Sequence, residues 1–159
     1  MTPGTTYHRG RKRRFAGPAS PAVVAFAALA LAVVRFRPFR AEVRGPSMEP
    51  GLRDGDWVLA LRLRPAVGDV VVVDHPARPG FEMVKRVAAG PGDEARALPG
   101  GEILPVPVRL GAGEWFVAGD RPAASTDSRS FGPVSTRHIR GVVRLAYRPG
   151  TGFVAIARP

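Results

Sequence analysis

Two residues in this sequence combine the side-chain types and the surroundings that nucleophilic acyl transfer requires. Ser47 lies in the stretch RGPSMEPGL, where prolines and glycines restrict the backbone and would hold a hydroxyl in one orientation. Lys85 is unusual because it and Lys12 are the only lysines among 24 cationic side chains. A lysine can lose its proton when buried and act as a base, whereas an arginine cannot. Ser47 and Lys85 are therefore candidates for a nucleophile and its base, beside the simpler interpretation of Ser47 as an ordinary turn residue.

The segment FEMVKRV around Lys85 has the pattern of a β-strand. In a strand, Met83, Lys85 and Val87 would share one face, and Arg86 could pair with Glu82 on the other. Apolar neighbours would desolvate the amine and lower its pKa, which must fall from about 10.4 to about 7–8 for a base near neutral pH. The competing interpretation is a lysine that extends its ammonium group into solvent.

The elements that would position these residues are mostly strands. Alternating or continuous apolar runs predict strands at 56–64, 69–74, 81–87, 114–120 and 139–149. Gly-Asp, Pro-Gly and Gly-Gly pairs separate them, and no amphipathic helix of normal length follows Arg44. At 159 residues the chain suits one domain with a real core. The sequence predicts a mostly β fold, a compact antiparallel sheet of barrel-like form preceded by one N-terminal apolar helix.

The apolar helix is expected near the N-terminus, where no charge occurs between Phe15 and Val34. We expect a basic tail at 1–16, a transmembrane anchor at 17–37 and the catalytic domain at 38–159. The dense apolar part is close to the lower limit of about 17 residues for a spanning helix. A cleaved signal peptide and an in-plane or buried helix are alternatives. The basic run RFRPFR that follows the apolar part favours a retained anchor, because cations there would hinder export.

The net charge of +11 raises the question of nucleic-acid binding. Most of the excess flanks the apolar segment, and neither a recognition-helix pattern nor an aromatic platform accompanies it. A membrane-surface flank is therefore the preferred interpretation, with no nucleic-acid partner. The sequence has no cysteine, and its three histidines lie far apart. We accordingly expect no disulfide, no metal site and no cofactor.

Four stretches carry a family resemblance: GPSMEPGLRDGDWVLA, AVGDVVVVD, VKRVAAGPGD and GDRPAASTDSRSFGPV. Their order and spacing resemble the motif boxes of type I signal peptidases, from about Glu42 to Tyr147. The resemblance implies that Ser47 is the nucleophile and Lys85 the general base. It also implies that the Ser125 hydroxyl orients the lysine amine. Further residues would hold the catalytic loop in shape, namely Asp127, Arg129 and Asp120.

The sequence departs from the usual family pattern at three positions. Gly51 stands where threonine is usual, and Arg121 stands where asparagine is usual. Gly45 occupies the place of a serine that donates to the oxyanion in some members. The oxyanion hole would then use the Ser47 N–H and a second donor that the sequence does not identify. The short stretch between Lys85 and Ser125 also lacks the large β insertion of longer members, which suggests a minimal catalytic core.

The substrate is expected to be an extended chain that adds as a strand. It would lie between the segment Glu42–Gly45 and the segment formed by Glu82, Met83 and Val84, with shallow pockets that favour small residues before the scissile bond. The expected activity is a serine endopeptidase that removes N-terminal leaders or propeptides. Its expected place is the plasma membrane, as a single-pass protein with the catalytic domain on the extracytoplasmic side.

Other functions remain open from the sequence. DHPARPG, the short middle and DSRSFGPV also resemble the small proteases that trim the precursor of nickel-containing superoxide dismutase. The self-cleaving repressors of the DNA-damage response share the serine–lysine pair, but they carry an N-terminal DNA-binding helical domain that residues 1–40 do not resemble. A non-enzymatic, membrane-anchored assembly protein is the remaining alternative.

Overall fold

The N-terminal helix is shorter than the segment predicted as an anchor. The computed structural model describes residues 20–97 and 103–156, so the predicted basic tail and residues 17–19 lie outside the described residues. Helix α1 spans Pro21–Phe36, with Ser20 as its N-cap and Pro21 in the first turn. It ends where Arg37 adopts a left-handed conformation and returns its N–H to the Val33 carbonyl. None of its residues is buried.

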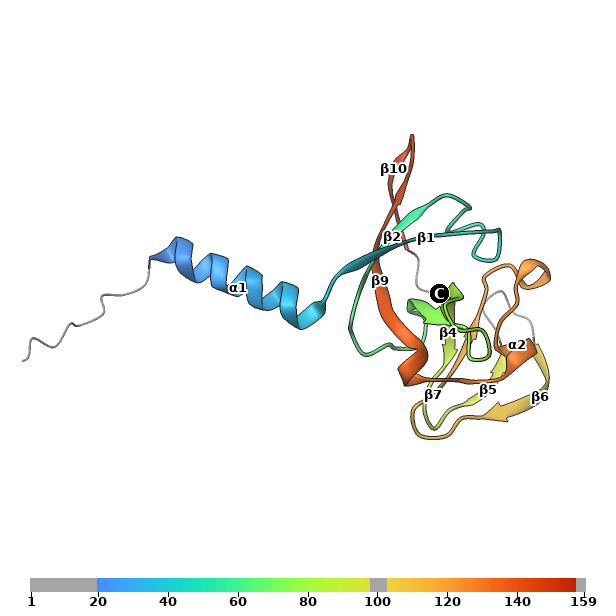
Figure 1. Cartoon of the computed structure of the whole chain (residues 1–159). Coiled ribbons are helices and arrows are strands. Elements are labelled where there is room, and N and C mark those ends of the chain that lie inside the picture. Colours follow the sequence, from blue (N-terminus) through green and yellow to red (C-terminus); the bar gives the residue numbers. More distant parts are fainter. Residues whose placement is uncertain (1–19, 98–102, 157–159) are drawn as a thin grey trace, which may run out of the picture.

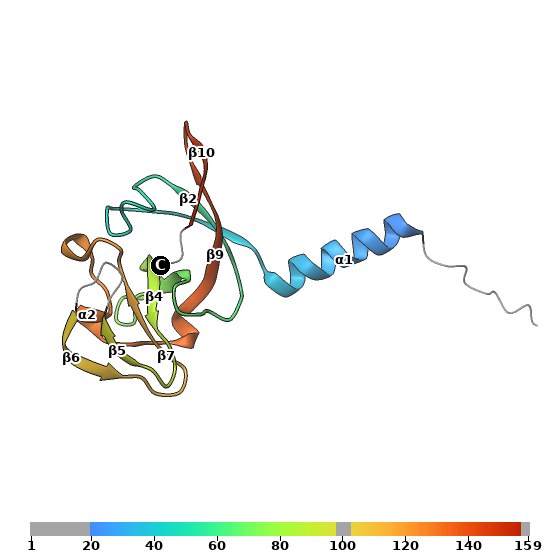
Figure 2. The same ribbon diagram turned by 180° about the vertical axis from the view of Figure 1, so that it is seen from behind.

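No helix in the described ranges is both long enough and apolar enough to cross a membrane. The C-terminal end of α1 is attached to the sheet, because the Arg62 N–H donates to the Phe36 carbonyl over 2.7 Å. In Figures 1 and 2, α1 projects from the side of a curled sheet that makes up the rest of the described chain.

The sheet is antiparallel at every pairing in the described part of the chain. Eight of its strands form one sheet in the order β1-β2-β9-β3-β4-β7-β8, with β10 paired to β9, and β5 pairs separately with β6. The strands are β1 (Phe39–Glu42), β2 (Trp57–Leu61), β3 (Val70–Asp74), β4 (Glu82–Ala89), β5 (Glu94–Ala97), β6 (Ile103–Arg109), β7 (Glu114–Ala118), β8 (Val134–Ser135), β9 (Ile139–Arg148) and β10 (Gly152–Val154). Three short helices complete the fold, namely η1 (Pro122–Ala124), α2 (Ser128–Phe131) and η2 (Thr136–His138).

The expectation of a mostly β, antiparallel, curled domain is confirmed. Each of the five predicted segments contains an observed strand, namely β2, β3, β4, β7 and β9. The strands β1, β5, β6, β8 and β10 were not predicted. Most of them are four residues or shorter, and such strands carry too few side chains for a period of two to be recognised.

Strand β3 explains how the sheet builds a core on both of its faces. Its valines alternate between two apolar clusters: Val70 and Val72 pack with one, and Val71 and Val73 pack with the other. All four side chains are at most 1% exposed. A continuous valine run suits this position, because a central strand covered on both faces has no polar side to present. Strand β4 lies next to β3, and its side chains alternate between the same two clusters.

Candidate active site

Ser47 follows strand β1 in a turn that buried apolar side chains fix to the core. Met48 and Leu52 belong to the same cluster as Val43, and Met48 is fully buried. The Leu52 N–H donates to the Met48 carbonyl over 3.0 Å, which closes the turn. Gly45 has a φ of 78°, a conformation that favours glycine, and its N–H donates to Asp54 Oδ1. The hydroxyl of Ser47 is therefore carried by a turn with little freedom to move.

Lys85 reaches Ser47 from strand β4. Its Nζ lies 2.8 Å from Ser47 Oγ, and the side chain is 4% exposed. The predicted face is confirmed, because Lys85 lies opposite Val71 and shares the side of the sheet where Met83 and Val87 pack. Lys85 is thus buried, with apolar side chains beside it on the strand, and does not extend its amine into solvent.

Burial lowers the pKa of the Lys85 amine from 10.5, because the charged form loses its hydration. Nearby charges act in both directions. The Asp127 and Asp120 carboxylates favour the ammonium form, and the Arg129 guanidinium opposes it. Desolvation is the largest of these effects, so the amine loses its proton more readily here than at an ordinary lysine.

Asp127 organises the loop that closes over Lys85. Its carboxylate is fully buried and accepts hydrogen bonds from the Gly119 N–H, the Ser125 hydroxyl and the Arg129 guanidinium. Burial acts to raise the pKa of this carboxyl, but the hydrogen bonds from Arg129, Ser125 and Gly119 hold it below the ordinary value. The pair of Asp127 with Arg129 is therefore a buried structural contact at 2.8 Å, where the sequence alone would suggest an exposed ion pair.

The Ser125 hydroxyl lies in this network, although its observed partner is not the one that the family resemblance implies. It donates to Asp127 Oδ2 over 2.6 Å, and within the described residues no hydrogen bond joins Ser125 to Lys85. Gly119 lets these groups come together. A Cβ there would lie 2.5 Å from the Ser47 carbonyl oxygen and would also collide with Ser125 Oγ.

Arg86 and Glu82 each pair with a residue other than the one expected from the sequence. Arg86 forms two hydrogen bonds of 2.7 Å with the Asp120 carboxylate, where a pair with Glu82 was predicted. The expected contact fails because Arg86 is itself 6% exposed and meets the loop after β7, a partner distant in sequence. Glu82 pairs instead with Arg140 on β9, at 3.1 Å.

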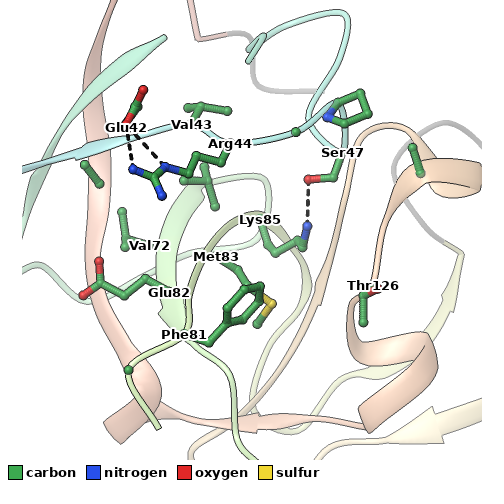
Figure 3. A pocket seen from close by; sticks show the side chains of 16 residues that line it. Glu42, Val43, Arg44, Ser47, Val72, Phe81, Glu82, Met83, Lys85 and Thr126 are labelled. Carbon is green, nitrogen blue, oxygen red and sulfur yellow. Dashed lines mark hydrogen bonds and ion pairs between the residues drawn. The ribbon is translucent and has the colours of Figure 1, made fainter. Parts of the chain in front are cut away.

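A groove of about 500 Å³ leads to Ser47 and Lys85 between β1 and the first half of β4. Figure 3 shows the hydrogen-bonded pair at one end, with Phe81 and Met83 along the β4 side. All the residues expected to contact a substrate strand line it, namely Gly45, Glu82, Met83 and Val84. Within residues 20–97 and 103–156, strand β1 pairs only with β2, and β7 joins β4 only from Arg86 onwards. Each wall of the groove therefore presents a strand edge that has no neighbour.

The sequence interpretation passed over two residues of the site, Gly119 and Glu49. Gly119 is required by the close approach of two loops, and a glycine beside an aspartate carries no distinguishing signal in a single sequence. Glu49 pairs with Arg121 at 2.6 Å, a contact that depends on the folded loops. In the described ranges, no group of three His, Cys, Asp or Glu side chains is placed to hold a metal ion.

The curled antiparallel sheet carries a groove that ends at Ser47 and the buried Lys85. A family model described as signal peptidase, peptidase S26, matches residues 18–104 and 100–148. The chain belongs to this signal peptidase family.

Curated relatives agree with this assignment. The chain is 34% identical over 114 residues to mitochondrial inner membrane protease subunit 1 of Xenopus tropicalis, covering 69% of this chain and 68% of that protein. It is 38% identical over 119 residues to mitochondrial ATP-independent inner membrane protease subunit 1a of Arabidopsis thaliana, covering 70% and 71%. Subunit 2 of the mouse inner membrane protease is 36% identical over 105 residues, covering 60% and 58%.

Proposed function

We propose that this peptidase is a serine endopeptidase in which Ser47 is the nucleophile and Lys85 the general base. The observation that carries the proposal is the 2.8 Å separation of Lys85 Nζ and Ser47 Oγ, with Lys85 as a residue only 4% exposed. A neutral amine at this distance can accept the hydroxyl proton while the oxygen attacks the scissile carbonyl. Lys85 then returns the proton to the leaving amine, and the same group activates the water that hydrolyses the acyl-enzyme.

The Ser47 N–H is available to the developing oxyanion. Within the described residues it donates to no protein acceptor, whereas the neighbouring Gly45 N–H is engaged by Asp54. A donor on the nucleophile's own backbone is placed next to the carbonyl under attack, where charge develops. Asp127, Arg129 and Ser125 serve as positioning residues for the loop above Lys85, and Asp120 holds the adjacent Arg86.

The substrate binds in extended form between the free edges of β1 and β4. Main-chain hydrogen bonds to two strand edges hold it irrespective of sequence, and the side chains beside the reacting carbonyl set its preference. Val43 and Val72 lie at the floor of the groove and are at most 2% exposed. A floor of packed side chains leaves little depth, which supports cleavage after small residues, as in the removal of leader peptides or propeptides.

The relatives are named as inner membrane proteases, and we extend membrane attachment to this chain. The exposed apolar side chains of α1 support this, among them Phe26 at 74% and Leu31 at 69% exposure. A single-pass anchor in the plasma membrane with an extracytoplasmic catalytic domain is the arrangement that we propose. Protection of the domain from added protease in sealed vesicles of known orientation would test the side on which it lies.

The deciding experiment compares the detergent-solubilised full chain with its Ser47→Ala variant on two substrates. One substrate is a precursor with an Ala-x-Ala leader, and the other is a nickel superoxide dismutase precursor. Serine-dependent cleavage of the leader establishes the proposed function, whereas cleavage of the dismutase precursor alone makes the chain a dedicated maturation protease. If both proteins are folded and neither substrate is cut, the proposal fails and a non-enzymatic assembly function gains support.

A further inference from the structure

Arg121 connects the two loops that carry the proposed catalytic groups. Its backbone N–H donates to the Ser47 carbonyl over 3.0 Å, and its guanidinium contacts Glu49 Oε2 at 2.6 Å. Glu49 lies two positions after Ser47 in the nucleophile turn. One residue of the loop after β7 therefore holds the turn at two points, at Ser47 through its backbone and at Glu49 through its side chain.

The same loop positions the surroundings of Lys85. Gly119 and Ser125, on either side of Arg121, are both bonded to the buried Asp127 carboxylate. Asp120, the immediate neighbour of Arg121, is fixed by Arg86 on β4, the strand that carries Lys85. The nucleophile turn, in contrast, meets this rigid assembly through few polar contacts, and Arg121 makes two of those that the structure describes.

We propose that the Arg121–Glu49 ion pair is a positioning device that holds the Ser47 turn at the correct distance from Lys85. This inference rests on the proposed function of the two residues. Neither Arg121 nor Glu49 lines the groove, so the pair is not part of the surface that would hold the substrate there. The two side chains are 53% and 33% exposed, and an ion pair of this kind adds little to stability. Its effect is expected on the rate, because a displacement of about 1 Å can cost about 100-fold in catalysis.

The test compares Glu49→Gln and Arg121→Gln with the unaltered full chain in detergent, on a peptide that it cleaves. We expect each substitution to lower kcat by about 10-fold with little change in KM. The double variant should lose no more than either single variant, since both remove the same contact. Exchanging the charges, with Glu49→Arg and Arg121→Glu together, should restore part of kcat. An exposed ion pair within one strand, Arg96 with Glu94 on β5, supplies the control, and Arg96→Gln should leave kcat unchanged.

A second measurement does not depend on cleavage. The residue-121 amide is bonded to the Ser47 carbonyl, so its hydrogen exchange reports whether the two loops stay together. Glu49→Gln should accelerate this exchange, and Arg96→Gln should not. Unchanged exchange and unchanged kcat in Glu49→Gln would overturn the inference while leaving the proposed function intact. If the unaltered chain cleaves nothing, the proposed function fails, and the exchange result alone then decides whether the pair holds the loops together.

Discussion

Lys85, which we propose as the general base, shows how the surroundings of one side chain change its protonation. The sequence marked it by type, since this chain otherwise uses arginine almost throughout, and alternation along the strand placed it between apolar neighbours. The structure adds that the amine is buried beside Ser47 and that two carboxylates and one guanidinium influence it. The three charged groups belong to the segment that follows β7, and the sequence around Lys85 does not predict that they lie near it.

The first prediction concerns the difference between lysine and arginine. Lys85→Arg should be as inactive as Lys85→Ala, a loss of about 100- to 10,000-fold in kcat, because a guanidinium keeps the charge but cannot accept the proton. Steady-state cleavage of a leader peptide measures the effect. Lys12→Arg, at the only other lysine, is the matched control and should retain full activity. Substantial activity in Lys85→Arg would exclude Lys85 as the base.

The second prediction concerns pH. Under the proposed mechanism activity requires the neutral amine, so kcat should rise with pH through the pKa of Lys85. Since burial lowers that pKa from 10.5, the rise should lie at a lower pH than for an ordinary lysine. A profile of kcat against pH measures its position. A rise that begins only near the ordinary lysine value would contradict the lowered pKa.

The same shift in the pKa affects stability. In the unfolded chain Lys85 takes up its proton at the ordinary pKa, whereas the folded protein resists protonation until the lower value. Stability should therefore fall as the pH drops below 10.5 and should stop falling once the folded amine is protonated. Lys85→Met removes this loss of stability. The Tm of the variant relative to the unaltered protein should therefore increase as the pH falls through the same interval. A constant difference in Tm between the two proteins across pH would contradict the expectation.

At the scale of elements, the site depends on two loops that approach closely beside the sheet. Strands with clear alternation, such as β2, or with a buried run, such as β3, could be predicted from the sequence. The loops could not. Asp127 is buried because donors from Gly119, Ser125 and Arg129 converge on it, and Arg86 meets Asp120 across 34 positions of sequence. The spacing of residues in the sequence predicts neither contact. The family resemblance identified the residues but not their hydrogen-bond partners.

A side chain at Gly119 should disturb the close approach of the two loops. Gly119→Ala would place a Cβ against the Ser47 carbonyl and Ser125, forcing the loops apart. We expect a destabilisation of about 1–3 kcal/mol from the overpacking and a loss of about 100-fold in kcat from the displaced nucleophile. Thermal melting and peptide cleavage measure the two effects.

Gly51→Ala is the matched control for Gly119→Ala. A Cβ at Gly51 would meet only ordinary contacts, 3.7 Å from the Met48 carbonyl and 3.9 Å from Asp120. It should therefore retain its Tm and most of its activity. Equal losses in both variants would show that any added methyl group near the turn is harmful, and the specific role given to Gly119 would be wrong.

In the molecule as a whole, the helix lies outside the core and the sheet carries the candidate active site. Helix α1 buries none of its residues, whereas the two clusters around β3 hold the domain together. Removal of residues 1–34 should therefore leave the Tm within about 2 °C and the cleavage of soluble peptides unchanged. Binding to lipid vesicles should be lost. A large fall in Tm would show that the helix contributes to the fold.

The hydrogen bond between the Phe36 carbonyl and the Arg62 N–H limits the reach of the enzyme. It joins the end of α1 to the end of β2, so the helix leaves the domain at a fixed point. From Phe36 to Ser47 even a fully stretched chain covers no more than about 40 Å. The scissile bond must therefore lie within about 40 Å of Phe36, whatever surface holds the helix. A protein cut by this enzyme therefore has to present its cleavage site close to the surface that holds the helix. A cleavage site farther away would not be cut, even if its sequence fits the groove.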